Sequence, residues 1–278
     1  YTIAVFQEGY LFDEADYQQM NLLANLNPAK ITWVSNVVQN EDRTYSEQAS
    51  PVSVTLAADM SFFGQENVLK NIYLETAAGT TKNLFANGHK LTIASSAEAK
   101  METDTQGNIT GGIFVYGGSD GAAVEKTDLT VEGRNFANLY GGGRGTAGTV
   151  TKTSTMKILL PADKTTRAKT ILTFGQVTGD GSDENGNPAA TVAGTKTVTI
   201  QPQTSGSEYE ASFAGLTGFD SLVLGENQTG TNYRNQVFRV TGRFDSKAVT
   251  PAAQNEANDR AGTDGNGGKV TLNRASLY

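Results

Sequence analysis

The sequence predicts an all-β chain whose short parallel strands stack in successive coils, a parallel β-helix (solenoid). Glycine contributes 31 of the 278 residues, about 11% where roughly 7% is usual, while hydrophobic and charged residues are both scarcer than in an ordinary globular domain. Glycine is costly inside a helix and suited to tight turns. Two kinds of short strand also alternate along the chain, and no 3.6-residue period persists after residue 60. These observations favour many short strands joined by many turns.

The first 30 residues differ from the rest and predict the only good helix. The stretch Phe12–Asn27 has Asp13 as a candidate N-cap and Asn27-Pro28 as a stop signal. Its apolar residues fall at helical spacings: Ala15, Leu22, Leu23 and Leu26. We therefore expect two regions: a short N-terminal helical cap over residues 1–30, and a β-helix domain over residues 31–278.

From Lys30 onward, short runs of β-branched and aromatic residues predict strands. The first are Ile31–Val34, Val52–Leu56 and Ile72–Leu74. Further strands have the alternating form apolar-x-apolar, at Leu91–Ile93, Leu129–Val131, Met156–Ile158, Val198–Ile200 and Val270–Leu272. Between them come strands that run into glycine or asparagine, at Leu84–Gly88, Phe114–Gly118, Leu139–Gly143 and Leu172–Gly175.

The aromatic residues of the second strand type set the size of one coil. Phe85, Tyr116, Tyr140 and Phe174 follow one another at separations of 31, 24 and 34 residues, the range of one coil with loops of variable length. Stacked coils would place these aromatic residues in an internal ladder. The alternative is an antiparallel β-sandwich, whose strands would recur more evenly, about every 8 to 12 residues.

Two polar segments interrupt the strands, Thr178–Pro188 and Ala248–Gly268. Exposed loops lengthen at little entropic cost, so we expect both to project from the stack and to carry any binding function.

Charge and composition exclude several classes of function. The net charge is −7, and without a dense basic patch it makes nucleic acid an unlikely partner. The absence of cysteine excludes disulfides, thiolate metal sites and a cysteine nucleophile. No apolar run approaches the roughly 18 residues of a membrane span, so we expect no membrane insertion. The chain starts at Tyr1 without a signal-like segment, which indicates a mature or trimmed fragment.

The repeat style resembles that of large cell-surface proteins of Gram-positive gut bacteria, adhesin-like proteins with pectin-lyase-like repeats. The resemblance covers residues 68–160, through Asn71–Leu74, Asn83–Gly88, Gly112–Gly118 and Asn138–Gly148. It implies a right-handed parallel β-helix in a secreted or wall-attached protein, an adhesin or stalk that is commonly one segment of a longer polypeptide. It also implies an extracellular location, on the bacterial surface or secreted.

The chain lacks the motifs of the enzymes that share this architecture. The Asn-Thr-Asp, Asp-Asp, Gly-His-Gly and Arg-Ile-Lys motifs of a polygalacturonase are absent; the nearest fragments are Lys126-Thr127-Asp128 and Gly88-His89-Lys90. A lyase would need clustered carboxylates and a base, for which the candidates are Asp104, Asp120, Asp128 and Arg134. His89, the only histidine, lies in a predicted turn. We expect no catalytic residues and a non-enzymatic protein.

Calcium is the one cofactor that the sequence leaves open. The loops Asp180–Gly186 and Asp264–Gly268 are acidic and rich in glycine, but neither fits the EF-hand spacing. The glycine run Gly141–Gly145 lacks the Lys-Ser/Thr ending of a phosphate loop, and we interpret it as a tight turn where side chains would clash.

The sequence thus predicts a surface adhesin or stalk that binds a glycan or a host extracellular protein. Tyr209 and Tyr233 lie in polar surroundings and are the candidate ligand-binding residues, since sugars pack on flat rings. The alternatives are a polysaccharide lyase or hydrolase whose acids converge across coils, and a mechanical spacer without a ligand. The oligomeric state is not predicted.

Overall fold

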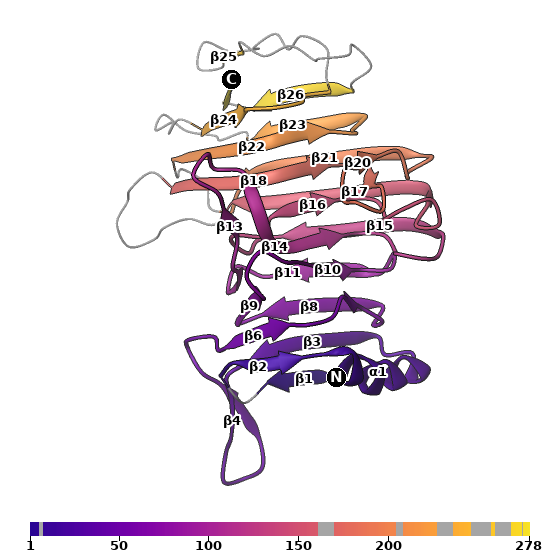
Figure 1. Cartoon of the computed structure of the whole chain (residues 1–278), viewed down its shortest axis with the longest axis vertical. Coiled ribbons are helices and arrows are strands. Elements are labelled where there is room, and N and C mark those ends of the chain that lie inside the picture. Colours follow the sequence, from indigo (N-terminus) through magenta and orange to yellow (C-terminus); the bar gives the residue numbers. More distant parts are fainter. Residues whose placement is uncertain are drawn as a thin grey trace.

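The structure is a computed structural model that describes residues 1–5, 8–160, 170–203, 208–226, 236–245, 257–258, 268–273 and 275–278. These residues form an all-β protein in which strands lie in layers along one long axis, with the N-terminal region at one end (Figure 1). Its helices are α1 (Glu14–Asn21) and a short 3-10 helix, η1 (Leu22–Leu26). The all-β prediction is therefore confirmed.

Two large sheets carry most of the strands. The first, the nine-stranded sheet, has the order β1 (Thr2–Val5), β3 (Lys30–Ser35), β8 (Glu66–Lys70), β11 (Lys90–Ile93), β15 (Val124–Val131), β17 (Val150–Leu160), β21 (Thr195–Pro202), β23 (Ser221–Gly225) and β26 (Lys269–Asn273). The second, the ten-stranded sheet, has the order β25 (Ala257–Asn258), β27 (Ala275–Leu277), β24 (Gln236–Val240), β22 (Tyr209–Thr217), β18 (Thr170–Thr178), β16 (Asn138–Tyr140), β14 (Ile109–Tyr116), β10 (Thr81–Phe85) and β7 (Met60–Ser61), with β13 (Glu102–Thr103) beside β14.

The chain moves from sheet to sheet in a regular order. A four-stranded sheet, with the order β12 (Ala97–Ala99), β9 (Ile72–Thr76), β6 (Ser53–Leu56) and β2 (Tyr10–Phe12), completes the first half of the stack. One visit to each sheet, such as β8, β9 and β10, is here called a pass, and the strands of consecutive passes pair in parallel.

Antiparallel pairs among the described strands belong to local hairpins. They join β13 to β14, β4 (Val37–Gln39) to β5 (Tyr45–Glu47), and β19 (Gly181–Ser182) to β20 (Pro188–Ala189). The alternative of an antiparallel β-sandwich is wrong, because the pairings along all three larger sheets are otherwise parallel.

The first 30 residues are more than a cap. As predicted, Asp13 caps α1 and forms a capping box with Asp16, and Asn27 ends η1 in the left-handed conformation. However, β1 pairs with β3 and β2 pairs with β6, so this segment also supplies strands. The predicted apolar face is wrong in part: Leu22 and Leu26 are 67% and 58% exposed, and it is Tyr17 and Met20 that pack against the core.

The predicted apolar-x-apolar strands lie in register in the nine-stranded sheet. A row is here the set of residues that successive passes place opposite one another. One row is apolar in all nine strands: Ile3, Trp33, Leu69, Ile93, Val131, Ile158, Ile200, Leu224 and Leu272. Three strands of this sheet were not predicted: β1, β8, and β23, in which Leu222–Leu224 supplies the same pattern. This row forms part of one continuous core that extends the length of the stack.

The predicted aromatic ladder exists, but it lies outside that core. Phe85, Tyr116 and Tyr140 are in register, with ring centroids 4.8 and 4.4 Å apart, and form a second buried cluster. Their neighbours Leu84, Val115 and Leu139 point to the opposite face of the sheet and join the main core. Phe174 is not in the ladder: Thr178 pairs with Tyr140, and Phe174 stacks on Phe213 inside the core at 5.2 Å.

A column of glycines follows the aromatic ladder at the corner of the stack. In this column a Cβ atom on one glycine would lie too close to the carbonyl oxygen of the glycine in the next pass. The distance would be 2.5 Å from Gly117 to Gly141, 2.6 Å from Gly141 to Gly179 and 2.6 Å from Gly179 to Gly218. Real Cβ atoms do not approach an oxygen so closely, and the space between stacked strands is fixed at about 4.8 Å. The interpretation of Gly141–Gly145 as a tight turn where side chains would clash is therefore confirmed.

We predict that Gly141→Ala destabilises the protein by roughly 1–3 kcal/mol, because the methyl group must displace the backbone of the next pass. Gly121→Ala is the matched control, since a Cβ there meets nothing within 4 Å and the backbone is not left-handed. Chemical denaturation of the two variants measures the difference, and equal stabilities would contradict the close-packed column.

Candidate functional site

A groove of about 660 Å³ lies on the ten-stranded sheet. Strands β14, β16, β18 and β22 supply its floor, and the turn between β13 and β14 supplies one wall. Phe114 adds a partly buried aromatic ring, and the polar side chains of the groove are amides and hydroxyls: Gln106, Asn108, Asn138, Thr173, Gln176, Ser212 and Thr241. Among the described residues that line it, none is ionisable.

The floor is held by register and by one oriented amide. Asn83, Phe114 and Asn138 lie opposite one another in β10, β14 and β16. Asn138 donates from Nδ2 to the hydroxyl of Tyr140 at 2.9 Å and accepts the Gln176 N–H at Oδ1 at 2.8 Å. Both ends of this amide are therefore fixed by partners on either side. Phe114, which is only partly buried, remains the side chain that presents a ring to the groove.

Two hairpins with the same turn flank Phe114. Residues 104–108 read Asp-Thr-Gln-Gly-Asn and residues 183–187 read Asp-Glu-Asn-Gly-Asn. In the first, Asp104 accepts backbone N–H groups from Gln106 and Asn108 and the Asn108 side-chain amide, at 2.8 to 2.9 Å. In the second, Asp183 makes the equivalent three bonds to Asn185 and Asn187. Each carboxylate therefore organises its own turn.

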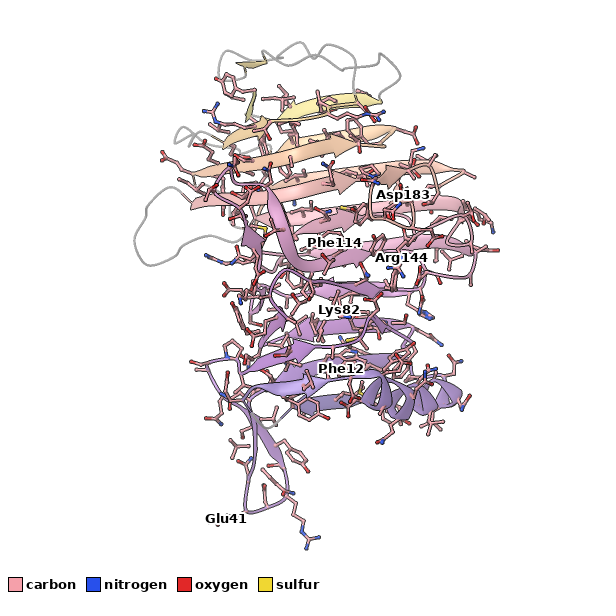
Figure 2. The ribbon with its side chains drawn as sticks, in the orientation of Figure 1. Phe12, Glu41, Lys82, Phe114, Arg144 and Asp183 are labelled. Carbon is pink, nitrogen blue, oxygen red and sulfur yellow. The ribbon has the colours of Figure 1, made fainter. Side chains whose placement is uncertain are left out.

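The second hairpin packs on the aromatic ladder. The hydroxyl of Tyr140 donates to the Gly186 carbonyl at 2.5 Å, and the hydroxyls of Tyr116 and Ser182 lie 3.0 Å apart. A Cβ on Gly186 would lie 3.3 Å from the Phe114 ring, so the turn borders that ring (Figure 2). Burial raises the pKa of Tyr116 to about 12 and raises that of Tyr140 as well, so both hydroxyls stay protonated. The expectation that Thr178–Pro188 projects from the stack is therefore wrong for its first half, where Asp180 and Ser182 are buried.

Two of the three carboxylates of the candidate calcium loop Asp180–Gly186, those of Asp180 and Asp183, are already held by protein donors. Asp180 accepts N–H groups of Thr191 and Val192, both at 2.7 Å, and its other oxygen lies 3.6 Å from Lys196 Nζ. Asp183 holds the turn described above. Among the described residues, no group of three His, Asp or Glu side chains is placed to bind a metal ion. In the second predicted loop, residues 264–267 lie outside the described residues.

The candidate acids of the enzyme alternative do not assemble in the groove. Asp120 holds Arg144 through a two-pronged ion pair that also raises the Arg144 pKa, and Asp59 lies 3.5 Å from the same guanidinium. Arg144 in turn covers the ring of Phe85 at 5.2 Å. These three charged residues thus shield one end of the aromatic ladder.

The other candidates lie elsewhere. Asp104 is bound in its hairpin turn, Asp128 lies on β15 in the nine-stranded sheet, and the backbone of Arg134 forms an isolated β-bridge with that of Glu98. His89 is part-buried in the turn after β10, and burial lowers its pKa. The described part of the chain therefore does not bring Asp104, Asp128 and Arg134 together with Asp120.

The prediction for Tyr209 is wrong. Its side chain is fully buried in the main core, where it alternates with Ala211 and Phe213 along β22. Tyr233 lies outside the described residues. The groove residues were not predicted from the sequence, although the recurrence of Asp-x-x-Gly-Asn at 104–108 and 183–187 is a signal for two similar hairpins.

Comparison with protein-family models, with curated proteins and with solved structures finds no match for this chain. No helix among the described residues has the length and apolar character that a membrane crossing requires.

We predict that low pH loosens the hairpin of residues 183–187. Hydrogen bonds from the Asn187 side chain and backbone hold the pKa of Asp183 below its ordinary value. A lowered pKa stabilises the folded turn above the ordinary value and loses that contribution as pH falls through the lowered one. The amide resonances of Asn185 and Asn187 should therefore shift together below about pH 4. Asp183→Asn should abolish this shift. If the shift in the wild type has its midpoint at the ordinary aspartate pKa, Asp183 does not have a lowered pKa.

Proposed function

We propose that this chain is a right-handed parallel β-helix from an extracellular bacterial surface protein, an adhesin or stalk, and that it binds a glycan in the groove beside Phe114 without cleaving it. The observation that carries the proposal is the chemistry of the groove, where amides, hydroxyls and the partly exposed ring of Phe114 meet and no described lining residue is charged.

The handedness follows from a general rule. Successive strands of each large sheet are parallel, and the chain leaves the sheet and returns to it between them. Such crossovers are right-handed in about 98% of cases, because strand twist favours that hand. The parallel, in-register passes thus support the finer fold, and the repeat style of residues 68–160 supports the surface location.

The lining suits a polyhydroxylated ligand. Side-chain amides such as those of Gln106, Asn108 and Gln176 both donate and accept, as sugar hydroxyls do. The partly buried ring of Phe114 offers an apolar face on which the C–H face of a sugar can pack. The volume of about 660 Å³ falls within the usual range of small-ligand sites, roughly 300–1,000 Å³.

The absence of charge in the described lining also favours binding over cleavage. Glycoside hydrolysis requires an acid and a base on either side of the bond, and a lyase requires a base. In a chain of net charge −7, a neutral groove further favours a neutral glycan over an acidic polysaccharide.

A host protein is the second candidate partner, and one feature favours it. The β4–β5 hairpin extends away from the N-terminal end of the stack (Figure 1), with Glu41 at its tip (Figure 2). It exposes Val38 and Tyr45, which are 48% and 59% accessible. Tyrosine is enriched among the residues that contribute most of the binding energy in protein interfaces.

The glycan proposal predicts that Phe114→Ala weakens binding of a neutral oligosaccharide about tenfold, a loss of about 1.4 kcal/mol. Calorimetric titration with neutral gluco-, xylo- and manno-oligosaccharides measures the affinity, and polygalacturonate serves as the acidic comparison. Tyr45→Ala is the matched control, since it removes an exposed ring outside the groove.

Three outcomes would contradict the proposal. They are equal binding of polygalacturonate, unchanged affinity in Phe114→Ala, and the appearance of cleaved products. Binding of a host protein that Tyr45→Ala abolishes, without any glycan binding, would favour the second candidate.

A further inference from the structure

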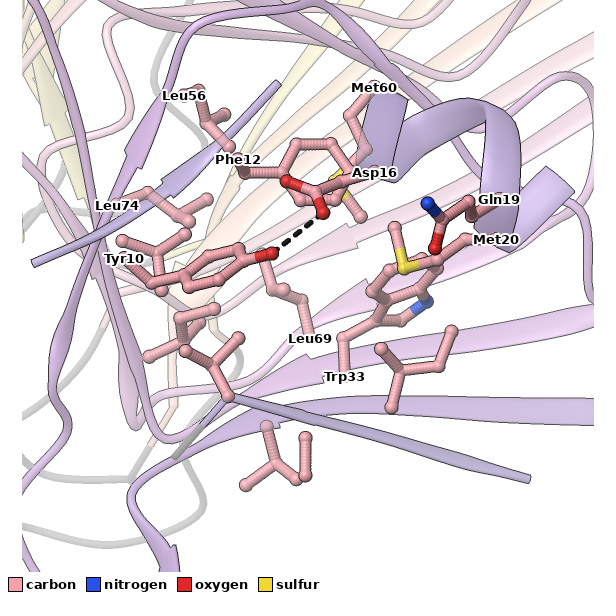
Figure 3. Close-up of a pocket in the computed structure, with 16 residues that line it drawn as sticks. Tyr10, Phe12, Asp16, Gln19, Met20, Trp33, Leu56, Met60, Leu69 and Leu74 are labelled. Atoms are coloured by element: carbon pink, nitrogen blue, oxygen red, sulfur yellow. Dashed lines mark hydrogen bonds between the residues drawn. The ribbon is translucent and has the colours of Figure 1, made fainter. Parts of the chain in front are cut away.

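A second cavity, independent of the groove, lies at the N-terminal end of the stack. It has a volume of about 400 Å³ and lies between α1 and the first strands (Figure 3). Its walls are mainly apolar, with Ile3 and Val5 from β1, Phe12 from β2 and Trp33 from β3. The apolar row of the nine-stranded sheet begins here, with Ile3 opposite Trp33. The cavity is therefore the unfilled beginning of the main core.

The helix that covers this end does not fill it. None of the residues of α1 is fully buried, and Met20 is only partly so. Protein interiors are close-packed and rarely keep voids larger than a water molecule. Among the described residues, six of the seven exposed large hydrophobic side chains lie within the first 45 residues, including Leu11 and Leu22.

The polar groups of the cavity are few and lie toward α1. The hydroxyl of Tyr10 donates to Asp16 Oδ1 at 2.7 Å, and Gln19 lies nearby (Figure 3). The indole N–H of Trp33 is buried and has no hydrogen-bond partner among the described residues. A buried donor without an acceptor costs free energy, so an acceptor on a bound molecule would relieve that cost.

We propose that this cavity binds the alkyl chain of an amphiphile whose polar end group is neutral, such as a hydroxyl. The apolar walls accommodate the chain. A hydroxyl oxygen accepts, as the unpartnered Trp33 N–H requires, and the group carries no charge. An anionic end group is excluded by charge, because Asp16 lines the cavity and Asp13 and Glu14 precede it in a chain of net charge −7.

Trp33 makes the proposal directly measurable, since it is the only tryptophan of the chain. Titration with 2-bromo-1-decanol, whose bromine lies beside the hydroxyl end, kept below its solubility limit, should quench the Trp33 fluorescence with a saturable curve. Bromine quenches only at close range, so saturable quenching places the alkyl chain beside the indole.

Two variants test the site. Ile3→Phe fills the cavity from β1 and should weaken the quenching at least tenfold, whereas Leu22→Phe adds the same ring at a position 67% exposed and absent from the lining and should leave it unchanged. Met20→Phe fills the cavity from α1 if Ile3→Phe does not fold.

The proposal is overturned by the absence of saturable quenching in the wild type, or by quenching that the filling variants leave unchanged. If 2-bromodecanoate quenches at the same concentration as the alcohol, the neutral end group is wrong. None of these results depends on the glycan groove, which lies on another part of the stack.

Discussion

The in-register contact between consecutive passes is the constraint on which the rest of the structure depends. Neighbouring parallel strands place equivalent residues of consecutive passes directly opposite one another. Each side chain must therefore pack against the equivalent side chain of the next pass. The nine-stranded sheet meets this condition with a continuous apolar row from Ile3 to Leu272. In the ten-stranded sheet, the rings of Phe85, Tyr116 and Tyr140 stack on one another. At the corner that follows these rings, the stacked residues are glycines.

The same constraint explains where a site can form. Side chains that face outward from consecutive strands gather in a surface strip, and hairpins inserted at the corners border that strip without disturbing the pairing. The groove beside Phe114 arises in this way, from four strands and the turn of residues 104–108. The hairpin of residues 183–187 is fixed from below by Tyr116 and Tyr140. The rigid stack therefore holds the amides of the groove in place before any ligand arrives.

Local patterns predicted the strands well and the sites poorly. The alternation in Leu91–Ile93 or Val198–Ile200 reports directly which side chains face inward, and the structure places these residues as expected. Tyr209 was predicted to face solvent because the residues around it are polar. Its alternation with Ala211 and Phe213 along the strand was the stronger signal, and it indicates an inward-facing side chain. Similarly, Leu22 and Leu26 are exposed because α1 ends at Asn21. Both leucines lie in the 3-10 helix η1, which does not continue the face of α1 that packs on the core.

The groove and the N-terminal cavity could not be predicted because distant residues compose them. Asn108 and Ser212 line the same groove although 104 residues separate them in the chain. The packing of the second hairpin likewise depends on the hydroxyl groups of Tyr140 and Tyr116, one and two passes away. Such contacts follow from the register, which periodicity alone does not provide.

The register is therefore the point to test. The chain has no cysteine, so a single introduced pair reports on one contact. Thr92 and Thr130 lie opposite each other in β11 and β15 and are partly exposed; their Cα atoms should be about 4.8 Å apart, within the range of a disulfide. Under mild oxidation, Thr92→Cys/Thr130→Cys should form an intramolecular disulfide in high yield. Thr92→Cys/Lys157→Cys, which is two strands apart, should not. A disulfide in the second pair but not in the first would contradict the stacked, in-register arrangement.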